Sequence, residues 1–70
     1  MNEKTFLEEM KKILDNENIR LDSALADIEE WDSLSILGYV ALAVHSCDKN
    51  ISPAQIRDCA TVGDLYALLQ

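Results

Sequence analysis

The residues best suited to chemistry lie in one short segment, Glu29-Glu30-Trp31-Asp32-Ser33-Leu34. It places a serine hydroxyl after a loop and at the predicted start of a helix, beside an aspartate that can cap that helix. A helix N-terminus has unpaired N–H groups and a partial positive charge, so it is a natural seat for a phosphate ester. Asp and Ser also fill these positions simply as caps, and the tripeptide alone leaves both interpretations open.

Two catalytic arrangements are conceivable around Ser33, and both fail. Glu29 and Glu30 would work as acid and base only in a dry pocket that shifts their pKa values, and nothing in the sequence encloses them. A Ser33–His45–Asp32 triad would need hydrogen bonds, but His45 lies roughly 18 Å along the same predicted helix at 1.5 Å per residue. We therefore predict no catalytic residue and a protein that is not an enzyme.

Metal binding and export are also disfavoured. His45, Cys47 and Cys59 lack a second ligand pair at metal spacing, so we expect no metal site. The spacing leaves a disulfide open, but each cysteine is expected to pack as a small apolar residue in a reducing compartment. The start is unlike a signal peptide and no apolar run would span a bilayer, so we expect a cytoplasmic protein without membrane contact.

The net charge of the chain restricts the classes of macromolecule that it is expected to bind. The net charge is −7, and the stretch from Asp22 to Asp32 holds five acids and no base. Such a field repels phosphate backbones, so we expect no nucleic-acid binding, and it favours encounter with basic protein surfaces. An ordinary acidic, soluble surface is the alternative interpretation.

Seventy residues allow one domain, 1–70, and no deep, water-free active site. Apolar spacing predicts a first helix from about Glu3 to Asp15. A long connection follows over 16–31, with a possible turn of helix at 23–26. Its apolar residues are the expected anchors: Leu21, Ala24, Leu25 and Ile28.

The second helix should begin at its N-cap Asp32 and continue to about Ser46. It is apolar almost all round, which requires burial on every side or an outer face left for a partner. The expected core side is Ile36, Tyr39, Val40, Ala43 and Cys47, and the opposite side is Leu34, Leu37, Ala41 and His45 with Gly38.

Capping signals define the remaining helices. Ser52 followed by Pro53 opens a short helix to about Asp58, and Thr61 with Asp64 resembles a capping box. The last helix should turn inward the side chains Val62, Leu65, Tyr66 and Leu69. The predicted fold is an all-α four-helix bundle with three longer helices, one short helix and a long loop between helices 1 and 2.

Over nearly its whole length the chain resembles the acyl carrier protein family. The matching features are size, acidity, the long connection, Asp32-Ser33-Leu34 at the start of the second helix, and the tail from Ile51-Ser52-Pro53 to Thr61-Val62-Gly63-Asp64-Leu65. The resemblance implies that Ser33 receives 4′-phosphopantetheine from coenzyme A through a separate magnesium-dependent transferase. The thiol of this arm would carry acyl groups as thioesters between enzymes.

By the same resemblance, Asp32 caps the helix and helps position metal and coenzyme A during transfer, and Leu34 contacts the transferase. The expected partners are the phosphopantetheinyl transferase and the enzymes that load or use the acyl group. The carrier itself is expected to be a monomer. The expected partner face comprises Leu34, Leu37, Ala41, Val44 and His45.

Where fatty-acid carriers have acids on this helix, the chain has Gly38, Val44 and His45, which implies a dedicated pathway with a more apolar partner surface. Two alternatives stay open. One is a small helical interaction module without a prosthetic group, and the other is an acidic mimic of nucleic acid.

Overall fold

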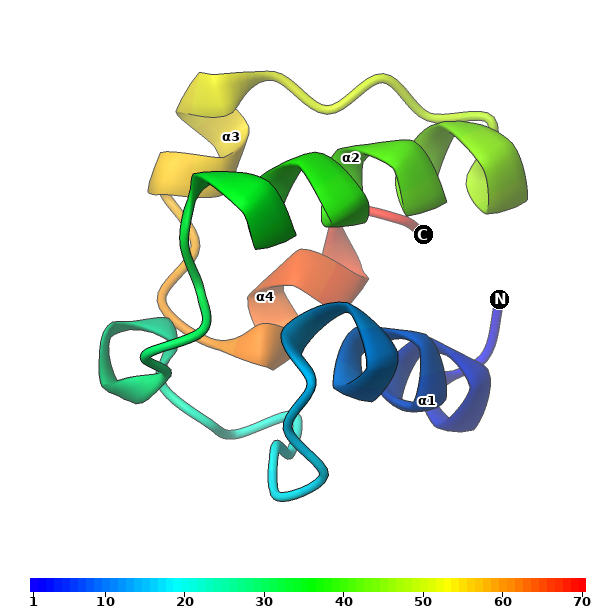
Figure 1. Cartoon of the computed structure of the whole chain (residues 1–70). Coiled ribbons are helices and arrows are strands. Elements are labelled where there is room, and N and C mark those ends of the chain that lie inside the picture. The colour runs from blue at the N-terminus through cyan, green and yellow to red at the C-terminus, as the bar shows by residue number, and fades with distance from the viewer.

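Four α-helices and one turn of 3₁₀-helix form the chain in the computed structural model, which describes residues 1–70 (Figure 1). The elements are α1 (Glu3–Leu14), the 3₁₀ turn η1 (Leu25–Asp27), α2 (Ser33–Cys47), α3 (Pro53–Arg57) and α4 (Val62–Ala67). The prediction of a small all-α domain with four helices and no strands is confirmed. The prediction of three longer helices is wrong, because two helices are long and two are short.

The shortness of α4 explains that error. Its α-helical part has only six residues, and the residues that follow form a tighter, 3₁₀-type turn. Leu69 N–H donates to the Tyr66 carbonyl at 3.0 Å and Gln70 N–H to the Ala67 carbonyl at 3.2 Å, which are the i to i−3 bonds of a 3₁₀ turn. Inward-facing apolar residues therefore continue beyond the helix that their spacing predicted.

The predicted caps are present. Asp32 caps α2, Ser52 caps α3 with Pro53 in its first turn, and Thr61 caps α4. The Thr61 hydroxyl accepts from Asp64 N–H at 3.2 Å, and the Asp64 carboxylate accepts from Thr61 N–H at 3.1 Å. The Ala60 N–H also donates to the Asp64 carboxylate, at 2.8 Å, and this bond together with that from the Thr61 N–H holds the pKa of Asp64 below its usual value. None of the four helices has the length and apolar character needed to cross a membrane.

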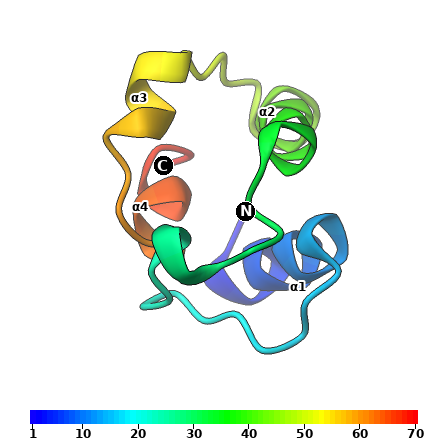
Figure 2. The same cartoon turned by 60° about the vertical axis from the view of Figure 1, so that its left-hand side comes forward.

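The two long helices pack against each other, with α2 seen end-on above α1 in Figure 2. Phe6 and Met10 of α1 and Tyr39 and Ala43 of α2 are fully buried. Gly38 does not belong to the outer face as predicted, because it is half-buried against α1. A Cβ at Gly38 would lie 3.0 Å from the Ile13 Cγ2 atom.

Tyr39 connects α2 to α4 through the centre of the core. Its hydroxyl donates to the Leu65 carbonyl at 2.7 Å, and no backbone N–H reaches that carbonyl in the last turn of α4. The bond therefore satisfies one of the acceptors that every helix C-terminus leaves open. Burial, with smaller contributions from Cys59 and Cys47, raises the pKa of Tyr39, which keeps the phenol a donor.

Backbone hydrogen bonds tie the long connection to the start of α4 (Figure 1). Leu25 N–H donates to the Ala60 carbonyl at 2.9 Å, and Val62 N–H donates to the Ser23 carbonyl at 3.0 Å. An isolated antiparallel bridge joins Ala24 to Thr61 between them. Because residues 23 and 24 are used in this bridge, the turn of helix predicted at 23–26 forms two residues later, as η1.

Gly63 lets the connection approach α4 closely. Its N–H donates to the Leu21 carbonyl at 2.7 Å, and a Cβ there would stand 3.0 Å from that oxygen. The glycine in the first turn of the helix is thus required by a close backbone contact.

The predicted anchors divide into two groups. Leu25 and Ile28 are buried, whereas Leu21 and Ala24 are half-buried. Ile19, which the sequence analysis did not single out, is 4% exposed and is the third buried anchor. Ile19 stands between Asn18 and Arg20 in a segment without helical spacing, so it gave no periodic signal.

We predict that Tyr39→Phe lowers the free energy of unfolding by about 1–2 kcal/mol, because it leaves a buried helix-terminal carbonyl without a donor. Urea unfolding followed by circular dichroism measures the change. Tyr66→Phe is the matched control, since the Tyr66 hydroxyl makes only an exposed 3.4 Å bond to the Met1 carbonyl and its loss should cost about 0.5 kcal/mol or less. Equal losses of unfolding free energy in the two variants would contradict the role given to the hydrogen bond from Tyr39 to the Leu65 carbonyl.

Candidate functional site

Ser33 occupies the first position of α2, and its side chain is exposed. Its hydroxyl makes no hydrogen bond in the structure, so the oxygen is free to react. The start of the helix is capped by Asp32, one residue before Ser33, and by Ser35, two residues after it. The Ser33 hydroxyl therefore contributes no hydrogen bond to the folded structure.

Asp32 and Ser35 form the cap. The Asp32 carboxylate accepts from Leu34 N–H at 3.0 Å and Ser35 N–H at 3.1 Å. In return, the Ser35 hydroxyl accepts from Asp32 N–H at 2.8 Å and donates to the Asp32 carbonyl at 3.0 Å. Ser35 is the single buried polar residue, 4% exposed, and the sequence analysis did not single it out. The Asp-x-x-Ser spacing was the signal for this reciprocal box.

This cap changes the electrostatics expected at Ser33. Two of the N–H groups at the helix N-terminus already bind the Asp32 carboxylate, and the exposed Glu29 and Glu30 lie next to it in the chain. Two of the N–H groups that could bind an anion at the start of α2 are therefore already occupied by a side chain of the chain itself.

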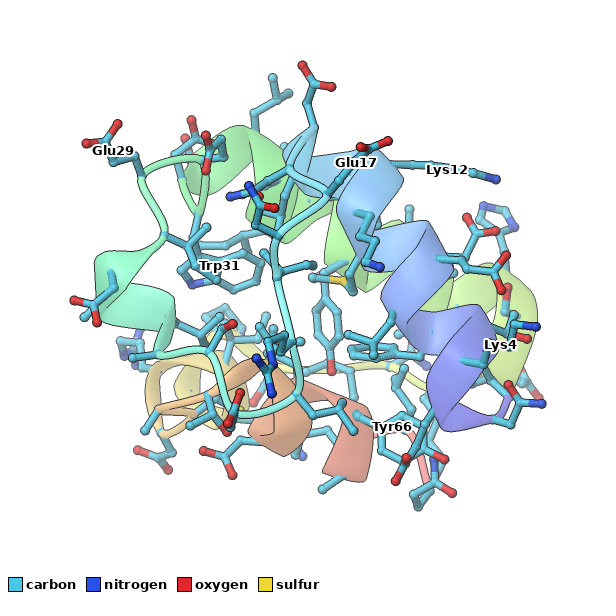
Figure 3. All side chains as sticks on the ribbon, turned by 90° about the horizontal axis from the view of Figure 1, so that it is seen from below. Lys4, Lys12, Glu17, Glu29, Trp31 and Tyr66 are labelled. Carbon is cyan, nitrogen blue, oxygen red and sulfur yellow. The ribbon has the colours of Figure 1, made fainter.

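Two contacts with the rest of the domain fix the loop before Ser33. The Trp31 ring lies edge-on to Tyr39, with ring centroids 6.3 Å apart and an interplanar angle of 74°. Trp31 is half-buried, and Figure 3 shows its ring turned inward while Glu29 points away from the domain. The Asn16 amide donates to the Glu30 carboxylate at 3.2 Å. The helix start is thus anchored at Trp31 and Glu30, two and three residues before Ser33.

The outer face of α2 is left uncovered by the rest of the chain. Leu34 is 77% exposed, Leu37 is 66% exposed and Val44 is 41% exposed, and Ala41 and His45 are exposed as well. The long connection does not cover this face. Of the two arrangements that the sequence allowed, burial of α2 on every side or an exposed outer face, the structure has the second.

An apolar groove of about 440 Å³ opens between α2 and α3. Ile36 and Leu37, one turn beyond Ser33, form the end of this groove nearest the hydroxyl. The other lining residues are Val40, Ile51, Pro53, Ile56 and Arg57.

The structure does not bring the other chemical candidates together. Ser33 and His45 lie on one continuous helix, roughly 18 Å apart at 1.5 Å per residue. No group of three or more His, Cys, Asp or Glu side chains is placed to hold a metal ion. Cys47 and Cys59 are free thiols, half-buried against the core. Burial, assisted by Asp64 and Asp58, raises the pKa of the Cys59 thiol.

Comparison of the chain with protein families, with curated proteins and with solved structures finds no match.

The cap geometry predicts how three substitutions act on stability. Asp32→Ala and Ser35→Ala should each lower the free energy of unfolding by about 1 kcal/mol, and the double variant should lose less than the sum because both break one box. Ser33→Ala should stay within about 0.5 kcal/mol of the parent chain, because its hydroxyl has no partner. Urea unfolding of all four variants checks this. Additive losses, or a loss for Ser33→Ala as large as that for Asp32→Ala, would contradict the geometry.

Proposed function

We propose that this chain is an acyl carrier protein that bears 4′-phosphopantetheine on Ser33. The observation that carries the proposal is the exposed hydroxyl at the first position of α2, free of hydrogen bonds and held in place entirely by neighbouring side chains. A tethered group needs such an attachment point. It needs no enclosed pocket, which a domain of this size is poorly able to build.

The proposed modification forms one bond and breaks one. The Ser33 oxygen loses its proton and forms an ester to the phosphate that bears pantetheine, while the P–O bond of the coenzyme A pyrophosphate breaks and the nucleotide half leaves with the other phosphate. A separate magnesium-dependent transferase supplies the catalytic groups. Once attached, the arm supplies a thiol that holds an acyl group as a thioester.

The residues of this chain then orient and shelter the arm. The capped start of α2 keeps the attachment point outside the core, and the groove between α2 and α3 begins one turn away. Its lining is apolar apart from Arg57, so the groove suits hydrocarbon cargo. The four helices with a long connection before α2 support an acyl-carrier-like bundle.

The proposed partners are the transferase and the enzymes that load or use the acyl group in a fatty-acid, polyketide or other specialised biosynthetic pathway. The acidic stretch that precedes Ser33 supports encounter with basic enzyme surfaces and disfavours nucleic acid. We place the carrier in the cytoplasm as a monomer.

The exposed face of α2 favours a second candidate, a small interaction module that docks another protein without a prosthetic group. The two candidates differ in their dependence on one oxygen atom. For a carrier, Ser33→Ala abolishes the cellular role, whereas for an interaction module this variant keeps it and Leu37→Asp or Ala41→Asp abolishes it.

We predict that incubation with coenzyme A, magnesium and a broad-specificity phosphopantetheinyl transferase adds the mass of one arm to the chain. Intact-mass spectrometry measures the shift, and fragmentation should locate it on Ser33. The Ser33→Ala variant should gain no mass, since it lacks the only oxygen proposed to react.

Ser46→Ala is the matched control. Ser46 is also an exposed serine on α2, but it lies in the last turn, so this variant should be modified like the parent chain. An unmodified parent chain after trials with several transferases, or a mass gain that survives Ser33→Ala, would contradict the proposal.

A further inference from the structure

Arg57 is the one charged residue in the wall of the groove between α2 and α3. The other lining residues are apolar, and no Asp or Glu is among them. Ligand pockets combine a mostly apolar wall with a small number of polar groups that fix the orientation of the ligand. The groove therefore has the composition of a site for a molecule that is mostly hydrocarbon and carries one anionic group.

The Arg57 guanidinium takes no part in the hydrogen bonds and ion pairs that stabilise the fold. Its side chain is exposed, and both ion pairs of the domain lie elsewhere. Asp58, the next residue, does not pair with it, and the side-chain hydrogen bonds at α3 come from Ser52, Gln55 and Cys59. The planar guanidinium has five N–H donors in a fork that matches a carboxylate, and all five are available to a ligand.

The groove lies beside the half of α2 that begins at Ser33, as the position of α3 in Figure 1 shows. Its wall on α2 spans only residues 36–40, which is about 6 Å at 1.5 Å per residue. A chain that enters from the side of Ser33 and ends inside this short groove has Arg57 as the only cation in the wall around it.

We propose that the acyl cargo of this carrier ends in a carboxylate that Arg57 binds in the groove, so that the cargo is the half-thioester of a short dicarboxylic acid. This inference rests on the proposed function, because the arm on Ser33 would bring the cargo to the groove. The apolar wall contacts the methylene groups, and the guanidinium binds the carboxylate through charge-assisted hydrogen bonds. A cargo that ended in a methyl group would make only the first of these two contacts.

The phosphate of the arm is the other anion near the groove. Because it would be bonded to Ser33, it would lie at the start of α2, before the first lining residue, Ile36. The cargo is instead carried at the flexible end of the arm, which can bend back into the groove. The arm without cargo therefore serves as a control that separates the two anions.

Hexanoate and hexanol test the groove in the chain without any arm. Titration of each into the ¹⁵N-labelled chain at low ionic strength should shift the amide resonances of Ile36, Val40 and Ile56. Arg57→Gln should weaken hexanoate binding about fivefold, which is the size expected of a partly exposed ion pair, and should leave hexanol binding within about twofold.

Arg20→Gln is the matched control. It removes the same charge from an exposed arginine that does not line the groove, so it should leave the binding of both ligands within about twofold. Circular dichroism checks that both variants remain folded.

The loaded carrier provides the second measurement. Succinyl and butyryl arms have the same four carbons and differ only in the carboxylate or methyl group at the end. After transfer of each arm from its coenzyme A thioester, the Arg57 Nε–H resonance should shift in the succinyl-loaded chain. In the butyryl-loaded chain it should stay where it is in the chain that carries the arm alone.

Four results would overturn the inference. They are no binding of hexanoate, an equal effect of Arg57→Gln on hexanoate and hexanol, an equal effect of Arg20→Gln and Arg57→Gln on hexanoate, and an Arg57 resonance that the arm alone shifts as far as the succinyl arm does. Failure of the carrier proposal is distinguishable from these results, because it is read from the mass of the chain after treatment with the transferase, whereas the hexanoate titration needs no arm.

Discussion

The reciprocal hydrogen bonds between Asp32 and Ser35 are the constraint on which the candidate site depends. They define where α2 begins, and they do so without using the side chain of Ser33. The cap uses Asp32 at the N-cap position and a buried serine one turn later, so Ser33 contributes only backbone to the helix start. A hydroxyl that stabilised the fold would be a poor attachment point, because modification would then weaken the domain.

The rest of the domain makes that small site rigid. Trp31 packs edge-on to Tyr39, and the Tyr39 hydroxyl reaches the last turn of α4. The long connection is bonded through its backbone to the start of α4, where Gly63 permits the close approach. A seventy-residue chain lacks the volume for a buried active site, but it can hold one surface atom in a defined place. Tethered chemistry is the kind of function that this architecture supports.

Local signals in the sequence predicted most of the fold. Asp32 and Ser52 were predicted as helix caps from residue type alone, and apolar spacing predicted α1 and the buried side of α2. Non-local features escaped prediction. The tight contact of Gly63 with the connection depends on Leu21, which lies 42 residues earlier in the chain, and the burial of Ile19 has no periodic pattern behind it. The sequence analysis did not single out Ser35, although its position three residues after Asp32 is the spacing of a capping box.

The central claim is that Ser33 carries the arm in the living cell, and the most direct measurement is the mass of the chain purified from its own cells. The account predicts a population heavier than the sequence by one phosphopantetheine arm, with or without an acyl group, and the added mass on the peptide that contains Ser33. A chain recovered only at the mass of its sequence, from cells whose other carriers are fully modified, would contradict it.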